Sequence, residues 1–284
     1  MKSSTFLPFK RLLLGIVFTS LGSLVSSHAA TLAYYDFSTD GANNTLPATL
    51  HDTSGNGYDV TRNGANSGTI LTAVQPSWST DPSLRLSIGG IDDYQPANAS
   101  VFNSAIAPSQ SFTIEMSISG TAFVDGMILS TVEDSPVNTG FYWALSPAGA
   151  LSLVSRTAGG GSVTDPTNLQ TNTWYALALT YDGSGKMDMY VNKILVGSNA
   201  SFTFSANPSY GFVLGQFKPG AGVYTGLRYN QIRFSDTVLS TSQMLGPVPE
   251  PNVASLVGLG VAAMTLRVFF PRRRSNSSRP LSNQ

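Results

Sequence analysis

The central part of the chain consists of short apolar or alternating runs, separated by Gly, Asn, Asp, Ser and Pro. Nothing before Pro247 repeats its apolar residues with the 3.6-residue period of a helix, whereas alternation between turn residues is typical of antiparallel strands. The number of predicted strands is larger than in an immunoglobulin-type sandwich. The pattern therefore predicts an all-β fold, a two-sheet antiparallel jelly-roll sandwich. The predicted strands are residues 32–37, 58–62, 69–74, 84–88, 111–119, 127–132, 141–146, 150–156, 174–181, 186–191, 194–198, 211–215 and 222–234.

The clearest local pattern predicts a hairpin at residues 174–191. In its first strand Leu177, Leu179 and Tyr181 lie on one face, and the other face carries a tryptophan and smaller residues. Because neither face is strongly polar, we expect a central strand that is covered on both sides. The loop Asp182-Gly-Ser-Gly185 supplies residues that tolerate positive φ, and the second strand turns two methionines and a valine inward.

Two apolar segments flank this central part, and the first predicts an export signal at residues 1–29. It begins with basic residues, continues with an apolar run at 12–25 and ends in Ser27-His28-Ala29, a small-x-small cleavage sequence. We expect cleavage after Ala29, because a cut one residue later would place His28 where a small side chain is required. The alternative is a first membrane anchor, which the short apolar run disfavours.

The second apolar segment, residues 253–270, predicts a transmembrane helix. Its 18 residues would make a helix of roughly 27 Å, close to the ~30 Å hydrocarbon thickness of a bilayer. Arg267 can extend toward the headgroups, and the basic stop signal Arg272-Arg273-Arg274 is expected to stay cytoplasmic. Residues 30–247 would then form one folded domain outside the membrane, and residues 275–284 a polar tail.

Charge separates the central domain from the two ends. Residues 30–247 hold eight of the sixteen Lys and Arg residues but fifteen of the sixteen Asp and Glu residues, a net charge of −7. Such a surface repels phosphate backbones, which argues against nucleic acid as a partner and favours cation sites with oxygen ligands. The chain has no cysteine. An exported domain without disulfides depends on a large core for its stability.

Five stretches of the domain stand out in order: Asp52-Thr-Ser-Gly-Asn-Gly-Tyr58, then residues 84–94, 111–118, 174–192 and 226–240. In sequence and in order they resemble the landmark blocks of laminin-G-like, concanavalin A-like domains. The resemblance covers nearly the whole central segment and implies the jelly-roll fold. Two departures are the lack of a tryptophan at residues 116–118 and Lys193 in place of a glycine.

The same resemblance implies a structural calcium ion. Relatives that bind calcium hold it near the aspartate of the early turn and an aspartate of the closing strand. The first corresponds here to Asp52, with Asn56 of the same turn as a further ligand, and the second corresponds to Asn230. Because Asn230 replaces a carboxylate by an amide oxygen, the site would be weakened. The alternative is that residues 52–57 form a turn whose side chains bond their own backbone.

The C-terminal segment, residues 248–274, combines the motif Val248-Pro249-Glu250-Pro251 with an apolar helix and the arginine cluster. This combination resembles the PEP-CTERM sorting signal of bacteria that make extracellular polysaccharide. It implies a partner, an exosortase, that cleaves near the motif. The chain would be transiently anchored in the inner membrane, with the domain outside, and would then reach the cell surface or be secreted. The alternative is a proline-stiffened linker before an ordinary membrane anchor.

Catalytic residues of familiar types are difficult to assemble from this sequence. Glucanases that share the implied fold pair two carboxylates, whereas the two glutamates of the domain, Glu115 and Glu133, fall on different predicted strands. Glu115 is interpreted as a solvent-facing residue. The domain has a single histidine, His51, and no Gly-x-Ser-x-Gly elbow, which argues against a nucleophilic triad. We therefore expect no catalytic site.

Carbohydrate binding is the function that the resemblance favours, because such sandwiches bind sugars through aromatic rings and planar polar groups. The chain is predicted to be a cell-surface or matrix protein that mediates adhesion or binds extracellular polysaccharide or surface glycans. Alternatives are a purely structural matrix protein without a specific ligand and, third, a glycan-cleaving enzyme. The candidate aromatic residues are Tyr34, Trp78, Tyr94, Tyr142, Trp143, Tyr190, Tyr210, Tyr224 and Tyr229.

Overall fold

The computed structural model describes residues 30–42, 44, 47–63, 68–86, 93–133, 138–206, 209–217 and 226–247. The predicted export signal, the motif at residues 248–251, the apolar segment and the arginine cluster at 272–274 lie outside these residues and stay predictions. Within the described ranges, no helix is long and apolar enough to cross a membrane.

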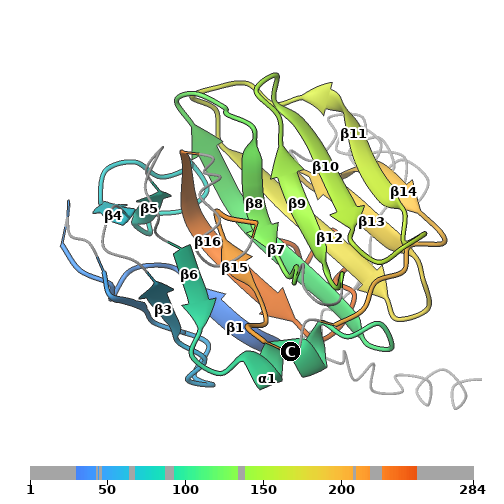
Figure 1. Cartoon of the computed structure of the whole chain (residues 1–284). Helices are drawn as coiled ribbons and strands as arrows, with labels where there is room; N and C mark the ends of the chain where they lie inside the picture. The colour runs from blue at the N-terminus through green and yellow to red at the C-terminus, as the bar shows by residue number, and fades with distance from the viewer. Residues whose placement is uncertain are drawn as a thin grey trace, which may run out of the picture.

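The strands form two antiparallel sheets that pack face to face (Figure 1). Sheet A contains β1 (Thr31–Tyr35), β4 (Gly68–Leu71), β5 (Ser83–Leu86), β7 (Ser111–Gly120), β12 (Tyr175–Asp182), β13 (Met187–Val191), β14 (Ile194–Asn199) and β16 (Leu227–Ser235). Its strand order is β14-β13-β12-β7-β16-β5-β4, and β1 also pairs with β16. The first and last strands of the sandwich therefore lie side by side.

Sheet B lies toward the viewer in Figure 1 and contains the remaining strands. They are β2 (Thr49–Leu50), β3 (Val60–Asn63), β6 (Asp93–Pro96), β8 (Gly126–Ser130), β9 (Phe141–Leu145), β10 (Ala150–Ser155), β11 (Ser162–Asn168) and β15 (Val213–Leu214). The order is β11-β10-β9-β8-β15-β6-β3-β2. The helix α1 (Ala99–Ala105) follows β6 and leads to β7 in sheet A. The all-β, two-sheet antiparallel sandwich is confirmed.

Each of the predicted strands overlaps an observed strand, and the observed elements that were not predicted are short or polar. The strand β2 has two residues, and the four-residue strand β6 ends in proline. The strand β11 reads Ser-Val-Thr-Asp-Pro-Thr-Asn, which suits only an edge strand because proline lacks an N–H donor. The expectation of no helix was wrong for α1, which is held in place by one buried side chain, Phe102.

Aromatic side chains fill the space between the sheets. The ring of Phe102 lies with its centroid 4.8 Å from that of Phe212 and 5.2 Å from that of Phe234, which joins the helix to both sheets. The buried Tyr229 of sheet A donates its hydroxyl to the carbonyl of Ile128 in sheet B at 2.8 Å. A buried tyrosine hydroxyl needs a hydrogen-bond partner. Because the partner here lies in the other sheet, the bond also joins the two sheets.

The predicted hairpin is formed by β12 and β13. The register pairs Leu177 with Val191 and Tyr181 with Met187, and these side chains belong to the core. In the loop, Gly183 has a φ of 78°, and the carboxylate of Asp182 accepts the Ser184 N–H at 2.8 Å. The strand β12 is central, between β7 and β13, and is covered on both sides as predicted.

Residues 236–247, which we call the C-terminal strap, cover the second side of β12. Leu239 and Met244 pack with Ala178 of β12 in a small hydrophobic cluster outside the main core. Thr113 of β7 donates its hydroxyl to the Thr237 carbonyl at 2.7 Å and accepts the Leu239 N–H at 2.9 Å. The strap is therefore fixed by polar and apolar contacts to the outer face of sheet A.

The interpretation of Glu115 as solvent-facing was wrong, because the strap covers it. The side chain points away from the core but is 1% exposed. It accepts the Leu245 N–H at 2.6 Å and the Arg233 Nε–H at 2.6 Å, and Arg233 also donates to the Gln243 carbonyl at 2.7 Å. Burial raises the pKa of Glu115, and Arg233 counteracts this increase. Strand alternation alone does not distinguish solvent from a covering segment.

Candidate functional site

The outer face of sheet B carries partly exposed side chains on β9 and β10, although Ser130 of β8 on the same face is buried. On β9, Phe141 and Trp143 point into the core, while Tyr142 between them points outward. Its cross-strand neighbour Val154 on β10 shares this face, as does Ser152. A ligand can therefore approach sheet B at β9 and β10.

An aromatic and cationic group lies at this position, and we call it the Tyr142 cluster: Tyr142, Phe217 and Arg156. The rings of Tyr142 and Phe217 meet edge to face with centroids 5.4 Å apart. The guanidinium carbon of Arg156 lies 5.3 Å from the centroid of the Phe217 ring. The hydroxyl of Ser130 in β8 donates to the Phe217 carbonyl at 2.5 Å, which holds this segment against the sheet.

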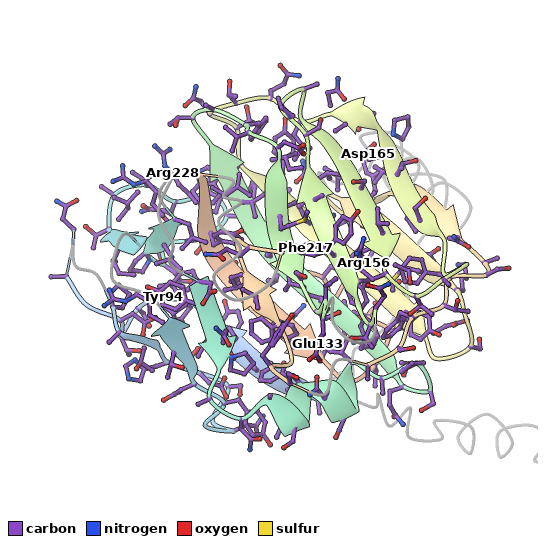
Figure 2. The ribbon with its side chains drawn as sticks, in the orientation of Figure 1. Tyr94, Glu133, Arg156, Asp165, Phe217 and Arg228 are labelled. Atoms are coloured by element: carbon purple, nitrogen blue, oxygen red, sulfur yellow. The ribbon has the colours of Figure 1, made fainter. Side chains whose placement is uncertain are left out.

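A carboxylate lies near the same end of the sheet. Glu133 follows β8 and forms an isolated bridge with Thr139 just before β9. Both of its carboxylate oxygens lie 2.9 Å from the Ser209 hydroxyl, which donates to them. Figure 2 shows Glu133 below Phe217 and Arg156, at the ends of β8 and β10. The face thus combines aromatic rings, a cation and a carboxylate.

This combination suits a sugar ring better than it suits bond cleavage. The C–H bonds of a sugar pack on aromatic rings, and planar charged groups bond its hydroxyls. Arg156 presents several donors in a fixed plane. The second glutamate of the domain, Glu115, lies on the other sheet beneath the strap, so Glu115 and Glu133 do not form the close pair of a retaining glucanase.

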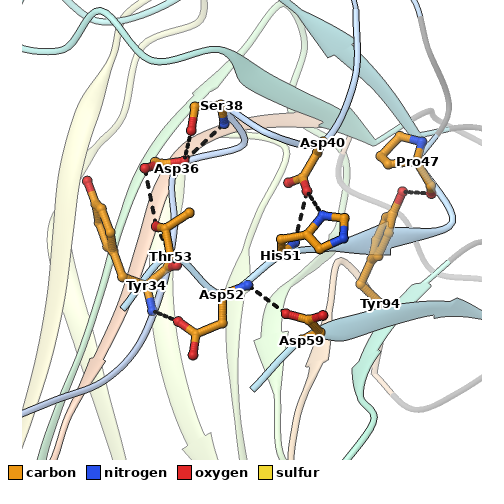
Figure 3. A network of polar contacts seen from close by, with 10 residues as sticks. All are labelled: Tyr34, Asp36, Ser38, Asp40, Pro47, His51, Asp52, Thr53, Asp59 and Tyr94. Carbon is orange, nitrogen blue, oxygen red and sulfur yellow. Dashed lines mark hydrogen bonds and ion pairs between the residues drawn. The ribbon is translucent and has the colours of Figure 1, made fainter. Parts of the chain in front are cut away.

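The predicted calcium residue Asp52 is engaged by hydrogen bonds. One oxygen accepts the Tyr34 and Ser54 N–H groups, both at 2.9 Å, and the other accepts the Ser54 hydroxyl at 2.9 Å and the Tyr58 N–H at 3.0 Å. Partial burial raises the pKa of Asp52, but the bonds from Tyr34, Tyr58 and Ser54 outweigh this and lower it. These contacts, partly shown in Figure 3, match the turn that was the alternative to calcium.

The other two predicted ligands also have contacts of their own. Asn56 donates its amide to the carbonyls of Thr31 and Leu32, both at 3.0 Å. Asn230 donates its amide to the carbonyls of Asp81 and Pro82, at 2.7 and 3.0 Å. The Asn230 amide oxygen is buried without a partner among the described residues, which is the one feature here that suits a cation. In the same ranges no group of three or more Asp, Glu, His or Cys residues is placed to hold a metal. Calcium binding stays a prediction.

His51 is attached to this region through Asp40 (Figure 3). Its backbone N–H donates to the Asp40 carboxylate at 2.8 Å, and its Nδ1 lies 2.7 Å from the same oxygen. The imidazole is 51% exposed. Burial raises the pKa of Asp40, and the bonds from His51 oppose the increase. The pair closes a loop next to β2.

The candidate aromatic residues fall into different environments. Tyr94, Trp143 and Tyr229 are fully buried core residues, and Tyr224 lies outside the described residues. Only Tyr142 belongs to the Tyr142 cluster. Phe217 and Arg156 were missed, because they follow strands rather than lie in them and no sequence pattern relates them to Tyr142.

Comparison with known sequences gives one family. The model of the family described as "Concanavalin A-like lectin/glucanases superfamily" matches residues 89–244, more than half of the chain. No curated protein sequence matches significantly. Among solved structures, domain 4 of AbnA, a GH43 extracellular arabinanase from Geobacillus stearothermophilus in complex with arabinotriose, is 18% identical with a TM-score of 0.54. The match covers 76% of this chain and 96% of that domain.

Two larger proteins contain a similar fold. The Trypanosoma rangeli sialidase in complex with sialic acid is 11% identical with a TM-score of 0.52, over 75% of this chain and 32% of the sialidase. A structure of botulinum neurotoxin type C, whose cell entry depends on interaction with two ganglioside molecules, is 12% identical with a TM-score of 0.54, over 75% and 49%. The chain spans about a third of the sialidase and about half of the neurotoxin structure, and the likeness is one of fold.

Proposed function

Because the chain belongs to the concanavalin A-like lectin/glucanases superfamily, we propose that its sandwich is a carbohydrate-binding module that acts outside the cell. Three similar structures come from proteins reported with arabinotriose, sialic acid or gangliosides. At this low identity the likeness is one of fold, so it suggests carbohydrate as the class of ligand and points to no particular sugar. Adhesion to extracellular polysaccharide or surface glycans follows from such binding.

The observation that carries this proposal is the Tyr142 cluster. Its residue Tyr142 lies on the outer face of sheet B and is partly exposed, whereas the equivalent outward residues on β7 and β12 of sheet A are buried. The bond from Ser130 to Phe217 and the packing of Arg156 on Phe217 hold the ring in place before a ligand binds. Preorganisation of this kind reduces the entropy lost on binding.

A glycan array tests the proposal directly. Residues 30–247 contain both sheets and the strap, so this segment is displayed to the array with calcium and with chelator. We expect Tyr142→Ala and Phe217→Ala to weaken binding about tenfold, because each removes a stacking surface. Tyr142→Phe is the matched control, since it keeps the ring and should bind nearly as well. Silence of the wild type in both conditions would leave the purely structural alternative.

We propose no catalytic activity for the domain. Glu115 is tied to Arg233 and to the strap, and Glu133 to Ser209, so neither glutamate is free to act as an acid with a nearby partner. Release of reducing sugar from a polysaccharide by purified wild-type protein, lost in Glu133→Gln or Glu115→Gln, would establish the enzyme reading instead.

Sorting by an exosortase is proposed for the C-terminal segment on the motif Val248-Pro249-Glu250-Pro251, the apolar run and the arginine cluster. Mass spectrometry of the native C-terminus, in cells with and without the exosortase, tests it. We expect a shortened chain only when the exosortase is present. Retention of the full tail in normal cells would favour an ordinary anchor.

A further inference from the structure

Two arginines face each other on sheet A. The register of β16 and β5 places Arg228 directly opposite Arg85. Their strand neighbours Leu84, Leu86 and Leu227 are buried in the core, so both arginine side chains point to the outer face. Side chains directly opposite on antiparallel strands have Cβ atoms roughly 4.5–5.5 Å apart, and like charges in this position are destabilising.

The pairing of two cations is unexpected because acidic residues outnumber basic residues in this domain. Arg233 and Lys186 on the same sheet each have a carboxylate partner, Glu115 and Asp188. Within the described part of the chain, no side-chain hydrogen bond or ion pair joins the guanidinium group of Arg85 or Arg228 to another residue. Two arginines therefore lie opposite each other without a carboxylate partner among the described residues.

The neighbouring strand β7 links the arginines to a tryptophan side chain. Across β16, Arg228 is opposite Ser119 of β7, which is buried. Two residues away on the same face, the Ser117 hydroxyl accepts the indole N–H of Trp78 at 3.4 Å. Two residues of a strand span roughly 6.6 Å, so the indole N–H of Trp78 lies on the strand next to Arg228, about this distance farther along it. Trp78 is partly exposed and is one of two tryptophans outside the main core.

The loop that carries Trp78 is fixed to the sheet on its other side. The Gln231 amide donates to the Asp81 carboxylate at 2.9 Å, and Asn230 donates to the carbonyls of Asp81 and Pro82. The Ser83 hydroxyl donates to the Val74 carbonyl at 2.6 Å. Trp78 is therefore held over the sheet before any ligand binds.

We propose that Arg85, Arg228 and Trp78 form a second site, which binds the carboxylate of a uronic acid unit in an acidic polysaccharide. A guanidinium group is opposite in charge to a carboxylate and matches its planar geometry. The indole nearby provides a surface for the sugar ring. A singly charged carboxylate is repelled by the acidic domain less than a phosphate would be. This site is on the opposite sheet from the Tyr142 cluster and does not depend on it.

Binding of polygalacturonate to the full chain, purified in neutral detergent, tests the proposal. We expect Arg85→Gln and Arg228→Gln each to weaken binding about tenfold, as for loss of a charge-assisted hydrogen bond. Trp78→Ala should weaken it as well, and Trp78→Phe should restore part of the loss. Lys193→Gln, at the opposite edge of the same sheet, is the charge-matched control, and its binding should match the wild type.

Stability distinguishes loss of a site from loss of the fold. Because Arg85 and Arg228 repel each other, each Gln variant should unfold at the same or a higher temperature than the wild type. Equal binding by the Arg variants and the Lys193 control would overturn the proposal. So would equal binding of the methyl-esterified polymer. Competition by inorganic phosphate as strong as that by free galacturonate would reject a uronate site in favour of a general anion site.

Discussion

The two sheets of this sandwich present different outer faces. On sheet A the C-terminal strap covers the middle strands, so that Thr113, Glu115 and Thr180 are buried although they point away from the core. On sheet B, Tyr142 of β9 and Val154 of β10 point outward and stay partly exposed. Outward polar residues of sheet A thus fasten a covering segment over the middle strands, whereas the outward side chains of Tyr142 and Val154 in sheet B stay partly open to solvent.

The largest expected difference separates two neighbours on β9. Trp143 is fully buried, so Trp143→Ala should lower the free energy of unfolding by about 3–5 kcal/mol. Tyr142→Ala, one residue away on the outer face, should lower it by about 1 kcal/mol. Urea unfolding of residues 30–247 measures both. Equal losses would mean that Tyr142 is part of the structural core and that sheet B is not open at this strand.

The two glutamates provide the next comparison, one on each face. Glu115→Ala leaves Arg233 without its partner beneath the strap and should cost about 3 kcal/mol, as expected for a broken buried pair. Glu133→Ala removes a bond to a serine at a partly exposed site and should cost less than about 1 kcal/mol. Both are read from urea midpoints. A small effect of Glu115→Ala would show that the strap is not fastened at this residue.

A glycine in the strap tests how closely it lies on sheet A. A Cβ at Gly246 would lie 2.3 Å from the Ala176 Cβ, and φ is +107° there. Gly159, in a loop after β10, has a φ of +75° but nothing within 4 Å of an added Cβ. Gly246→Ala should therefore cost about 2 kcal/mol, and Gly159→Ala about 1 kcal/mol from backbone strain alone. Thermal unfolding compares them, and equal costs would argue against close packing of the strap.

The smallest expected effect on stability is that of removing calcium from its predicted site. If the ion binds at Asp52, Asn56 and Asn230, chelation should lower the Tm by about 2–4 °C, which corresponds to about 1 kcal/mol in a domain of this size. Asn230→Asp directs a carboxylate at the carbonyls of Asp81 and Pro82. The variant should be less stable in chelator and recover with calcium. An unchanged melt for both proteins would reject the site.

Much of the fold could be predicted from local pattern. Leu177, Leu179 and Met187 alternate with the period of a strand, and Asp182 with Gly183 and Gly185 marks the turn, so the hairpin was predicted with its correct inward face. The strand β11 was missed, since its composition is that of a loop and it is held by pairing with β10. Pairing partners far away in sequence leave no local signal.

The candidate sites were less predictable for the same reason. Tyr142 was named among the candidate aromatic residues, but Phe217, which contacts it, and Arg156, which contacts Phe217, lie 75 and 14 residues farther along the chain. The opposition of Arg85 and Arg228 depends on the register between β5 and β16, which are far apart in the chain. No spacing rule relates such residues.

The sequence by itself determined the class of the fold and its family resemblance, because side-chain alternation and turn residues act locally along the chain. It also carried the predictions for the two terminal segments, which the described residues do not include. Only the tertiary structure decided which outer face is covered. Whether an outward residue such as Glu115 meets water or the strap depends on where residues 236–247 fold back, and that position is set by packing and long-range hydrogen bonds rather than by the strand that carries the residue.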